Sequence, residues 1–165
     1  MRNEPLSPIT LSVLWNGLLS IAEEMGKSRL VVVNRLDRDR ASFRRALESI
    51  QKILGRAAVP IQLPLGEEKD FNGVVDLVKL KAYRYKGDEK GSFEEKDVPP
   101  EMKDEVEAAR SALVEMVAEG DDALMEKYLE TGELSPEEFL SGLKRAVTAG
   151  KIFPVLACSG GRNIG

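Results

Sequence analysis

The stretch VVVNRLDR, residues 31 to 38, joins three valines to a polar tetrapeptide that ends at Asp37. An apolar run without alternation is typical of a strand that is buried on both faces, as in a parallel sheet. Such a strand would place Asn34 and Asp37 in the loop at its carboxyl end. Two interpretations follow: a loop that binds a nucleotide base, or a polar turn in which Asp37 caps the next helix.

Helical patterns lie on both sides of this strand, which should cover residues 29 to 33. After it, apolar residues recur at helical spacing up to residue 54, with Asp37 or Asp39 as the expected N-cap and Gly55 as the stop. Before it, a stripe predicts another helix that stops at Gly26. The two stripes are Phe43, Leu47, Ile50, Ile53 and Leu54, and Leu11, Leu14, Leu18, Ile21 and Met25.

A second apolar run, residues 151 to 157, leads into Cys158-Ser159-Gly160-Gly161. Like the first run it predicts a buried strand followed by a polar loop. We interpret these two strands as parts of one buried sheet. The residues between the sheet strands then form an inserted region.

The central part of the chain alternates more than the outer strands do. Residues 59–63, 73–78 and 79–85 predict short strands of a smaller sheet with one exposed face, which ends at DVPPE, residues 97 to 101. Helices follow over residues 102–117, 121–129 and 136–149. The last of them begins with a capping box, in which Ser135 is the N-cap and Glu138 is the third helical residue.

Composition limits the chemistry and the partners. The chain has 165 residues, 32% of them charged, and a net charge of −4, which disfavours direct nucleic-acid binding. It has no histidine, so reactions would depend on carboxylates, lysines or hydroxyls. The single cysteine, Cys158, excludes an intramolecular disulfide and favours a reducing, cytoplasmic location. We expect Cys158 to be structural rather than reactive.

Several longer stretches resemble the elongation factor G family, translational GTPases that drive translocation on the ribosome. The resemblance covers residues 26 to 165, whereas residues 1 to 20 do not match. The matching stretches are RLVVVNRLDR, VPIQLPLGEE, FNGVVDLVKLKAYRY, FEEKDVPPEM, LMEKYLETGELSPEE and SGGRNIG.

The resemblance implies a guanine site built from two loops. In such loops an Asp carboxylate accepts from the two N–H donors of guanine, an Asn amide ties the loops together, and a long side chain packs over the ring. A backbone N–H of the second loop binds the guanine carbonyl oxygen. The implied residues are Asn34, Arg35 in place of Lys, Asp37, Ser159, Gly160 in place of Ala, and Gly161.

The resemblance also implies the fold class, an α/β protein. It would hold part of a P-loop GTPase-type sheet, namely its last two strands and helices, carrying an inserted small α+β subdomain called G prime. Residues 1–56 would be the partial G domain with the NRLD loop. Residues 57–149 would be the insert, and residues 150–165 the last strand with the SGG loop.

The phosphate-binding motifs of the family are missing from the sequence. No G-x-x-x-x-G-K-[ST] run occurs, and the formal D-x-x-G match, residues 70–73, follows the NRLD loop instead of preceding it. A full-length relative would bind GTP or GDP with magnesium. We expect this chain to have no catalytic residue and no metal ligand, and to be an inactive fragment by itself.

The alternative is a free-standing protein-interaction module. The family is thought to contact the C-terminal domain of the ribosomal stalk protein through the insert. The expected partner is therefore the ribosome, and no membrane is expected. An acidic helix face suits that contact, although such a face can also be merely solvated. A third interpretation is an inert fragment that folds. The acidic residues are Glu101, Asp104, Glu105 and Glu115.

Overall fold

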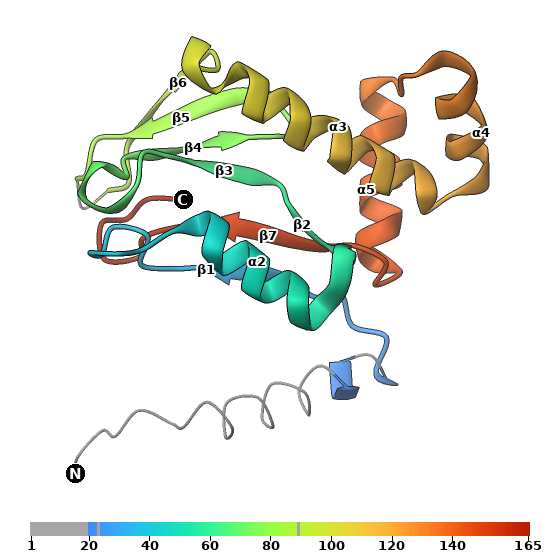
Figure 1. Cartoon of the computed structure of the whole chain (residues 1–165), viewed down its shortest axis with the longest axis horizontal. Helices are drawn as coiled ribbons and strands as arrows, with labels where there is room; N and C mark the ends of the chain where they lie inside the picture. The colour runs from blue at the N-terminus through green and yellow to red at the C-terminus, as the bar shows by residue number, and fades with distance from the viewer. Residues whose placement is uncertain (1–19, 23, 89) are drawn as a thin grey trace.

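The computed structural model describes residues 20–22, 24–88 and 90–165. Figure 1 shows two sheets in separate layers, with helix α2 (Phe43–Leu54) below the lower sheet and helix α3 (Lys103–Glu119) above the upper one. The predicted N-terminal stripe lies largely outside the described residues. Ile21 and Met25 of that stripe are exposed.

The lower sheet is parallel, in the order β1-β7-β2, and contains both strands that the sequence predicted. Its strands are β1 (Val31–Val33), β7 (Phe153–Ala157) and β2 (Ala58–Pro60). The central strand β7 is buried along most of its length, but Val32 of β1 is 49% exposed. The expectation that β1 is buried on both faces is therefore wrong, because β1 is an edge strand of this sheet.

Helix α2 begins later than either predicted cap. Ser42 is the N-cap, and its side chain accepts from the N–H of Arg45 at 3.5 Å. Asp37 and Asp39 do not cap this helix, because a turn closed by the bond from Ala41 N–H to the Arg38 carbonyl separates them from it. Gly55, with a φ of 69°, ends the helix as predicted.

The upper sheet is antiparallel, in the order β3-β4-β5-β6. The predicted strand 59–63 is in fact two strands, because Ile61 donates to Val155 of the lower sheet and accepts from Leu77 of the upper layer. Strand β6 was not predicted, and all its residues are exposed, so it lacks an apolar pattern. The strands are β3 (Gln62–Leu65), β4 (Gly73–Asp76), β5 (Lys81–Tyr85) and β6 (Phe93–Lys96).

The expected exposed face of the upper sheet is not seen at β4. Val74 and Val75 point to opposite faces, and both are buried. Helix α3 covers one side of this sheet and the parallel layer lies on the other side (Figure 1). The upper sheet is therefore an internal layer at β4 and is exposed along the whole of β6.

The helices agree with the predictions from sequence. After α3 come α4 (Asp122–Thr131) and α5 (Pro136–Thr148). The capping box of α5 is confirmed: Ser135 Oγ accepts from Glu138 N–H at 3.3 Å, and Glu138 Oε2 accepts from Ser135 N–H at 3.0 Å. Among the described residues, none of the helices is long and apolar enough to span a membrane.

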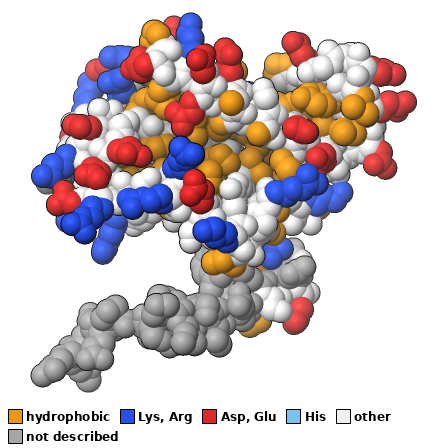
Figure 2. Space-filling view, viewed as in Figure 1, with side chains coloured by type: hydrophobic (Ala, Val, Ile, Leu, Met, Phe, Trp, Pro, Cys, Tyr) orange, Lys and Arg blue, Asp and Glu red, His pale blue; other side chains and the backbone are white. Residues whose placement is uncertain are grey.

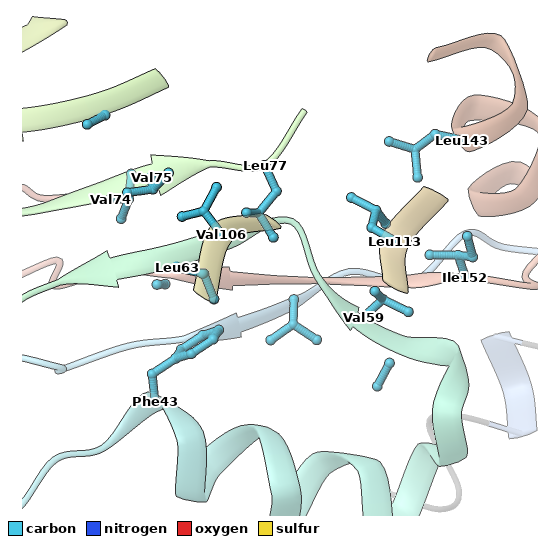
Figure 3. Packing of buried hydrophobic residues seen from close by; sticks show 14 of the residues in the cluster. Phe43, Val59, Leu63, Val74, Val75, Leu77, Val106, Leu113, Leu143 and Ile152 are labelled. Carbon is cyan, nitrogen blue, oxygen red and sulfur yellow. The ribbon is translucent and has the colours of Figure 1, made fainter. Parts of the chain in front are cut away.

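One hydrophobic core connects the two layers. Figure 3 shows Phe43 and Val59 from the lower layer near Leu63 and Val106 from the upper one. Leu113 and Ile152 continue this cluster toward α5. The inserted region therefore packs directly against the parallel sheet, so the two parts of the chain form one body.

Candidate functional site

Two loops leave the parallel sheet side by side. The first base loop, residues 34–40, follows β1, and the second base loop, residues 158–164, follows β7; both lie at the left end of Figure 1. The N–H of Cys158 donates to the Val33 carbonyl at 2.9 Å, and the N–H of Leu36 donates to the Cys158 carbonyl at 3.3 Å. The parallel pairing of β1 and β7 thus continues into the loops, at the sheet edge where α/β proteins bind ligands.

Asp37 and Ser159 form the central contact between the loops. The Ser159 hydroxyl donates to Asp37 Oδ1 at 2.6 Å, and Ser159 is completely buried. This hydrogen bond is the main cause that lowers the pKa of Asp37. Desolvation opposes it, and a backbone N–H, Arg38 and Arg162 add smaller lowering contributions. The Asp37 side chain is 14% exposed, so it presents an ionised carboxylate to solvent at neutral pH.

Asn34 joins the two loops through its side-chain oxygen. Asn34 Oδ1 accepts from the N–H of Arg35 at 2.7 Å and from the N–H of Gly160 at 3.0 Å. The Sγ atom of Cys158 lies 3.5 Å from the same oxygen. Arg35 adopts a left-handed backbone with a φ of 64°, and its side chain is exposed. Asn34 therefore connects the first base loop to the second.

The N–H of Gly160, which the resemblance implies as the donor to the guanine carbonyl, has a partner within the protein. It is already donated to Asn34, so a base carbonyl at this position would compete with that bond. Gly161 is exposed, and no atom lies within 4 Å of where a Cβ would stand. The second base loop is therefore open to solvent on the Gly161 side.

A turn of the inserted region contacts both loops, which the sequence did not predict. This insert turn, residues 66–71, connects β3 to β4. Arg162 Nη1 donates to the carbonyls of Lys69 at 3.1 Å and Phe71 at 3.0 Å, while Glu68 Oε1 accepts from the N–H of Arg40 at 2.9 Å. No residue pattern signals such bonds, because they join positions that are 93, 91 and 28 apart in the sequence.

The formal D-x-x-G match, residues 70–73, lies at the end of the insert turn and the start of β4. Asp70 ends the short helical turn Glu68–Asp70, Phe71 is fully buried, and Gly73 begins β4. Within the described residues there is no group of three His, Cys, Asp or Glu side chains that could hold a metal ion.

The predicted acidic residues are all exposed. Glu101 precedes α3, while Asp104, Glu105 and Glu115 lie on it. At 100° per residue, Asp104 and Glu115 share one stripe about 16 Å apart along the helix. Exposed or half-buried small residues lie between them, including Ala108, Ser111 and Ala112.

A hollow of about 280 Å³ runs along the same helix, between α3 and the segment around β2. Glu119 at the end of α3 is already paired with Arg56, whose Nη2 lies 2.7 Å from Glu119 Oε2. Figure 2 shows hydrophobic side chains between the two layers in the middle of this face, with charged groups of both signs around them. The hollow is lined by Gln51, Arg56, Val59, Pro60, Ala109, Ala112, Glu115, Met116 and Glu119.

The fold is that of an α/β protein with a parallel sheet and a separate antiparallel sheet inserted between its strands. Its sequence is 44% identical to elongation factor G of Mycoplasma pneumoniae over 137 residues, which are 83% of this chain and 20% of that relative. A crystal structure of a protein from Thermus thermophilus matches it with a TM-score of 0.79 and 37% identity.

That structural match covers 91% of this chain and 22% of the Thermus chain. No family model matches the chain. Over the aligned residues, the chain belongs to the elongation factor G family, and it spans about a fifth of the length of the relative that it matches.

Proposed function

We propose that the chain supplies the guanine-reading part of a nucleotide site in a translation factor of the elongation factor G family. The observation that carries this proposal is the contact of Asp37 with Ser159 across the two base loops. If Asp37 were only a helix cap, its carboxylate would bind the first turn of α2. Ser42 does so instead, which leaves Asp37 at the sheet edge.

The geometry suits guanine better than adenine. Asp37 is an ionised acceptor with lone pairs beyond the one that binds Ser159, and guanine offers two adjacent N–H donors on its pairing edge. Adenine offers an acceptor at the middle position of that edge. Asn34 uses its oxygen between the loops, so its amide NH₂ remains as a donor toward the base.

In this proposal, the phosphates of the nucleotide are bound by other segments of a full-length relative. The sequence has no P-loop, whose N–H groups and lysine make the strong charged contacts with nucleotide phosphates. A base pocket alone should bind guanosine diphosphate with a dissociation constant of about 1 mM or weaker. We therefore expect no GTP hydrolysis by the chain itself, whereas a full-length relative would use GTP or GDP with magnesium on the ribosome.

NMR titration of the ¹⁵N-labelled chain tests the guanine assignment. Millimolar guanosine diphosphate should shift the amides of residues 34–37 and 159–161, and adenosine diphosphate at equal concentration should not. Asp37→Asn should abolish the guanosine effect and favour xanthosine diphosphate, because an amide donor would meet the xanthine carbonyl. Equal shifts with both wild-type titrations, or none, would refute base reading by these loops.

A second candidate function uses the acidic face of α3. We propose that Asp104, Glu105 and Glu115, with Glu101, dock a lysine-rich surface such as the C-terminal domain of the ribosomal stalk protein. The small residues between Asp104 and Glu115 leave room for a partner to approach the helix closely. Such contacts should be weak and sensitive to salt, since exposed ion pairs contribute about 1 kcal/mol or less.

The matched test compares two triple charge reversals by NMR titration with the stalk domain at low and moderate salt. The first changes Asp104, Glu105 and Glu115 to lysine, and it should abolish the shifts. The control reverses three charges on and after α4, and it should leave the shifts unchanged. Equal effects of both variants would assign any binding to net charge alone. The control positions are Glu126, Glu130 and Glu133.

A further inference from the structure

The insert turn is joined to the second base loop through the side chain of Arg162. Arg162 spans this gap from the base-loop side. Its backbone is fixed within the loop, because its N–H donates to the Ser159 carbonyl at 3.1 Å. Its guanidinium holds the carbonyls of Lys69 and Phe71. Ser159 is thus connected to the insert turn through one residue.

The insert turn is itself a constrained element. Gly66 has a φ of 78°, and a Cβ there would lie 2.3 Å from the Asp70 carbonyl oxygen, so only glycine fits. The N–H groups of Asp70 and Phe71 close the turn on the carbonyls of Glu67 and Glu68. Phe71 is fully buried in the core. The carbonyls that Arg162 binds therefore have positions set by the inserted region.

The second base loop is also fixed by backbone hydrogen bonds between its first and last residues. The N–H of Ser159 donates to the Ile164 carbonyl at 2.8 Å, and the N–H of Ile164 donates back at 3.1 Å. Ile164 is buried, and so is Ser159. A movement of the Arg162 side chain would consequently be passed to the closed ring of residues 159–164, and from Ser159 Oγ to Asp37.

We propose that Arg162 is a positioning residue through which the insert turn sets the place of Ser159 and the orientation of Asp37. A partner or movement that displaces the insert turn would then change the base-reading pair without touching the nucleotide. The consequence for guanine readout rests on the proposed function, whereas the connection between the turn and the loop does not. Arg162 acts mainly through Ser159, with a smaller direct electrostatic effect on Asp37, and needs no contact with the ligand.

The first experiment measures amide hydrogen exchange of the whole chain without ligand. Arg162→Ala should accelerate exchange at Ser159 and Ile164 at least about tenfold, because it removes both charged hydrogen bonds that join the second base loop to the insert turn. Arg56→Ala is the matched control, because it removes a guanidinium that pairs with Glu119 elsewhere. Unchanged exchange in Arg162→Ala, or equal acceleration in Arg56→Ala, would overturn the proposal.

The second experiment perturbs the insert turn from its own side and forms a double-mutant cycle. Gly66→Ala should shift the amide signals of Ser159 and Gly160, and most of that shift should disappear in the Arg162→Ala background. If Gly66→Ala fails to fold, Phe71→Leu provides a milder change of the same turn. Shifts of equal size in both backgrounds would show that the coupling does not pass through Arg162.

A nucleotide titration separates this proposal from the base-reading proposal. If wild type shows guanosine-specific shifts, Arg162→Ala should weaken the apparent affinity about threefold to tenfold. Unaltered affinity would overturn the proposed effect on readout. If wild type shows no guanosine-specific shift, base reading fails, and the exchange and cycle experiments still decide whether Arg162 couples the turn to the loop.

Discussion

The hydroxyl of Ser159 donates a 2.6 Å hydrogen bond to Asp37 Oδ1, although the two residues are 122 positions apart. The contact exists because β1 and β7 are parallel neighbours and their carboxyl ends reach the same sheet edge. It lowers the pKa of Asp37, and Ser42 rather than Asp37 caps the helix that follows. The inserted region therefore separates these residues in sequence and not in space.

Removing the Asp37 carboxylate should cost stability. Asp37→Ala leaves the buried Ser159 hydroxyl without its acceptor, and we expect a loss of about 1–3 kcal/mol in the free energy of unfolding. Urea unfolding measures this loss. Ser159→Ala in the Asp37→Ala background should restore part of it, because neither partner then remains unpaired. A simple sum of the two single losses would contradict the pairing.

Acid should weaken the start of α5. Lys127, at 2.5 Å, and the backbone and side chain of Ser135 lower the pKa of Glu138 from 4.5 to about 2. Because this folded-state pKa is depressed, the stabilisation is present above pH 4.5 and is lost as pH falls toward 2. Thermal unfolding of wild type and Glu138→Gln should therefore differ at about pH 7 and converge near about pH 2. A constant difference over this range would be inconsistent with the assignment.

Gly142→Ala should lower the free energy of unfolding even though Gly142 lies within a helix. Alanine is about 1 kcal/mol better than glycine in a helix interior. A Cβ at Gly142 would, however, lie 2.7 Å from Val117 Cγ1 and 2.5 Å from Leu124 Cδ1. Overpacking of this kind costs about 1–3 kcal/mol, so the net change should be destabilising. Chemical unfolding with exposed Ser141→Ala as a control separates packing from propensity.

Cys158 should react slowly with thiol reagents in the folded protein. Its side chain is partly buried, and desolvation raises the pKa of its thiol, so little of the reactive thiolate forms at neutral pH. We expect labelling to be at least about tenfold slower than in urea-unfolded chain. Rates that are equal in both states would show that the cysteine is accessible and reactive.

The features that could be predicted from sequence are those with local causes. The capping box at Ser135 and Glu138 depends on bonds between residues three apart, so a short stretch of sequence contains all of it. The apolar stripe of α3 and the stop at Gly55 are equally local. These elements agree with the prediction because neighbours along the chain determine them.

The strand predictions that were wrong concern residues whose structure is set by a partner distant in sequence. Residues 59–63 were predicted as one strand, but the two halves of this segment bond to different sheets, and Ile61 bridges them. Strand β6 has no buried residue and exists because β5 pairs with it. The cap of α2 is a different case, because its cause is local: the turn closed between Arg38 and Ala41 places Ser42 directly ahead of the first helical residue.

The sequence alone determined the two strands, the polar residues at their carboxyl ends and the helices of the insert, because hydrophobic periodicity and capping are properties of neighbouring residues. The tertiary structure decided which polar groups meet. The pairing of β1 with β7 brings Asn34 to Gly160 and Asp37 to Ser159. The packing of the upper sheet places the Lys69 and Phe71 carbonyls within reach of Arg162. Hydrogen bonds act over about 3 Å, so chain segments this far apart in sequence interact only after folding places them in contact.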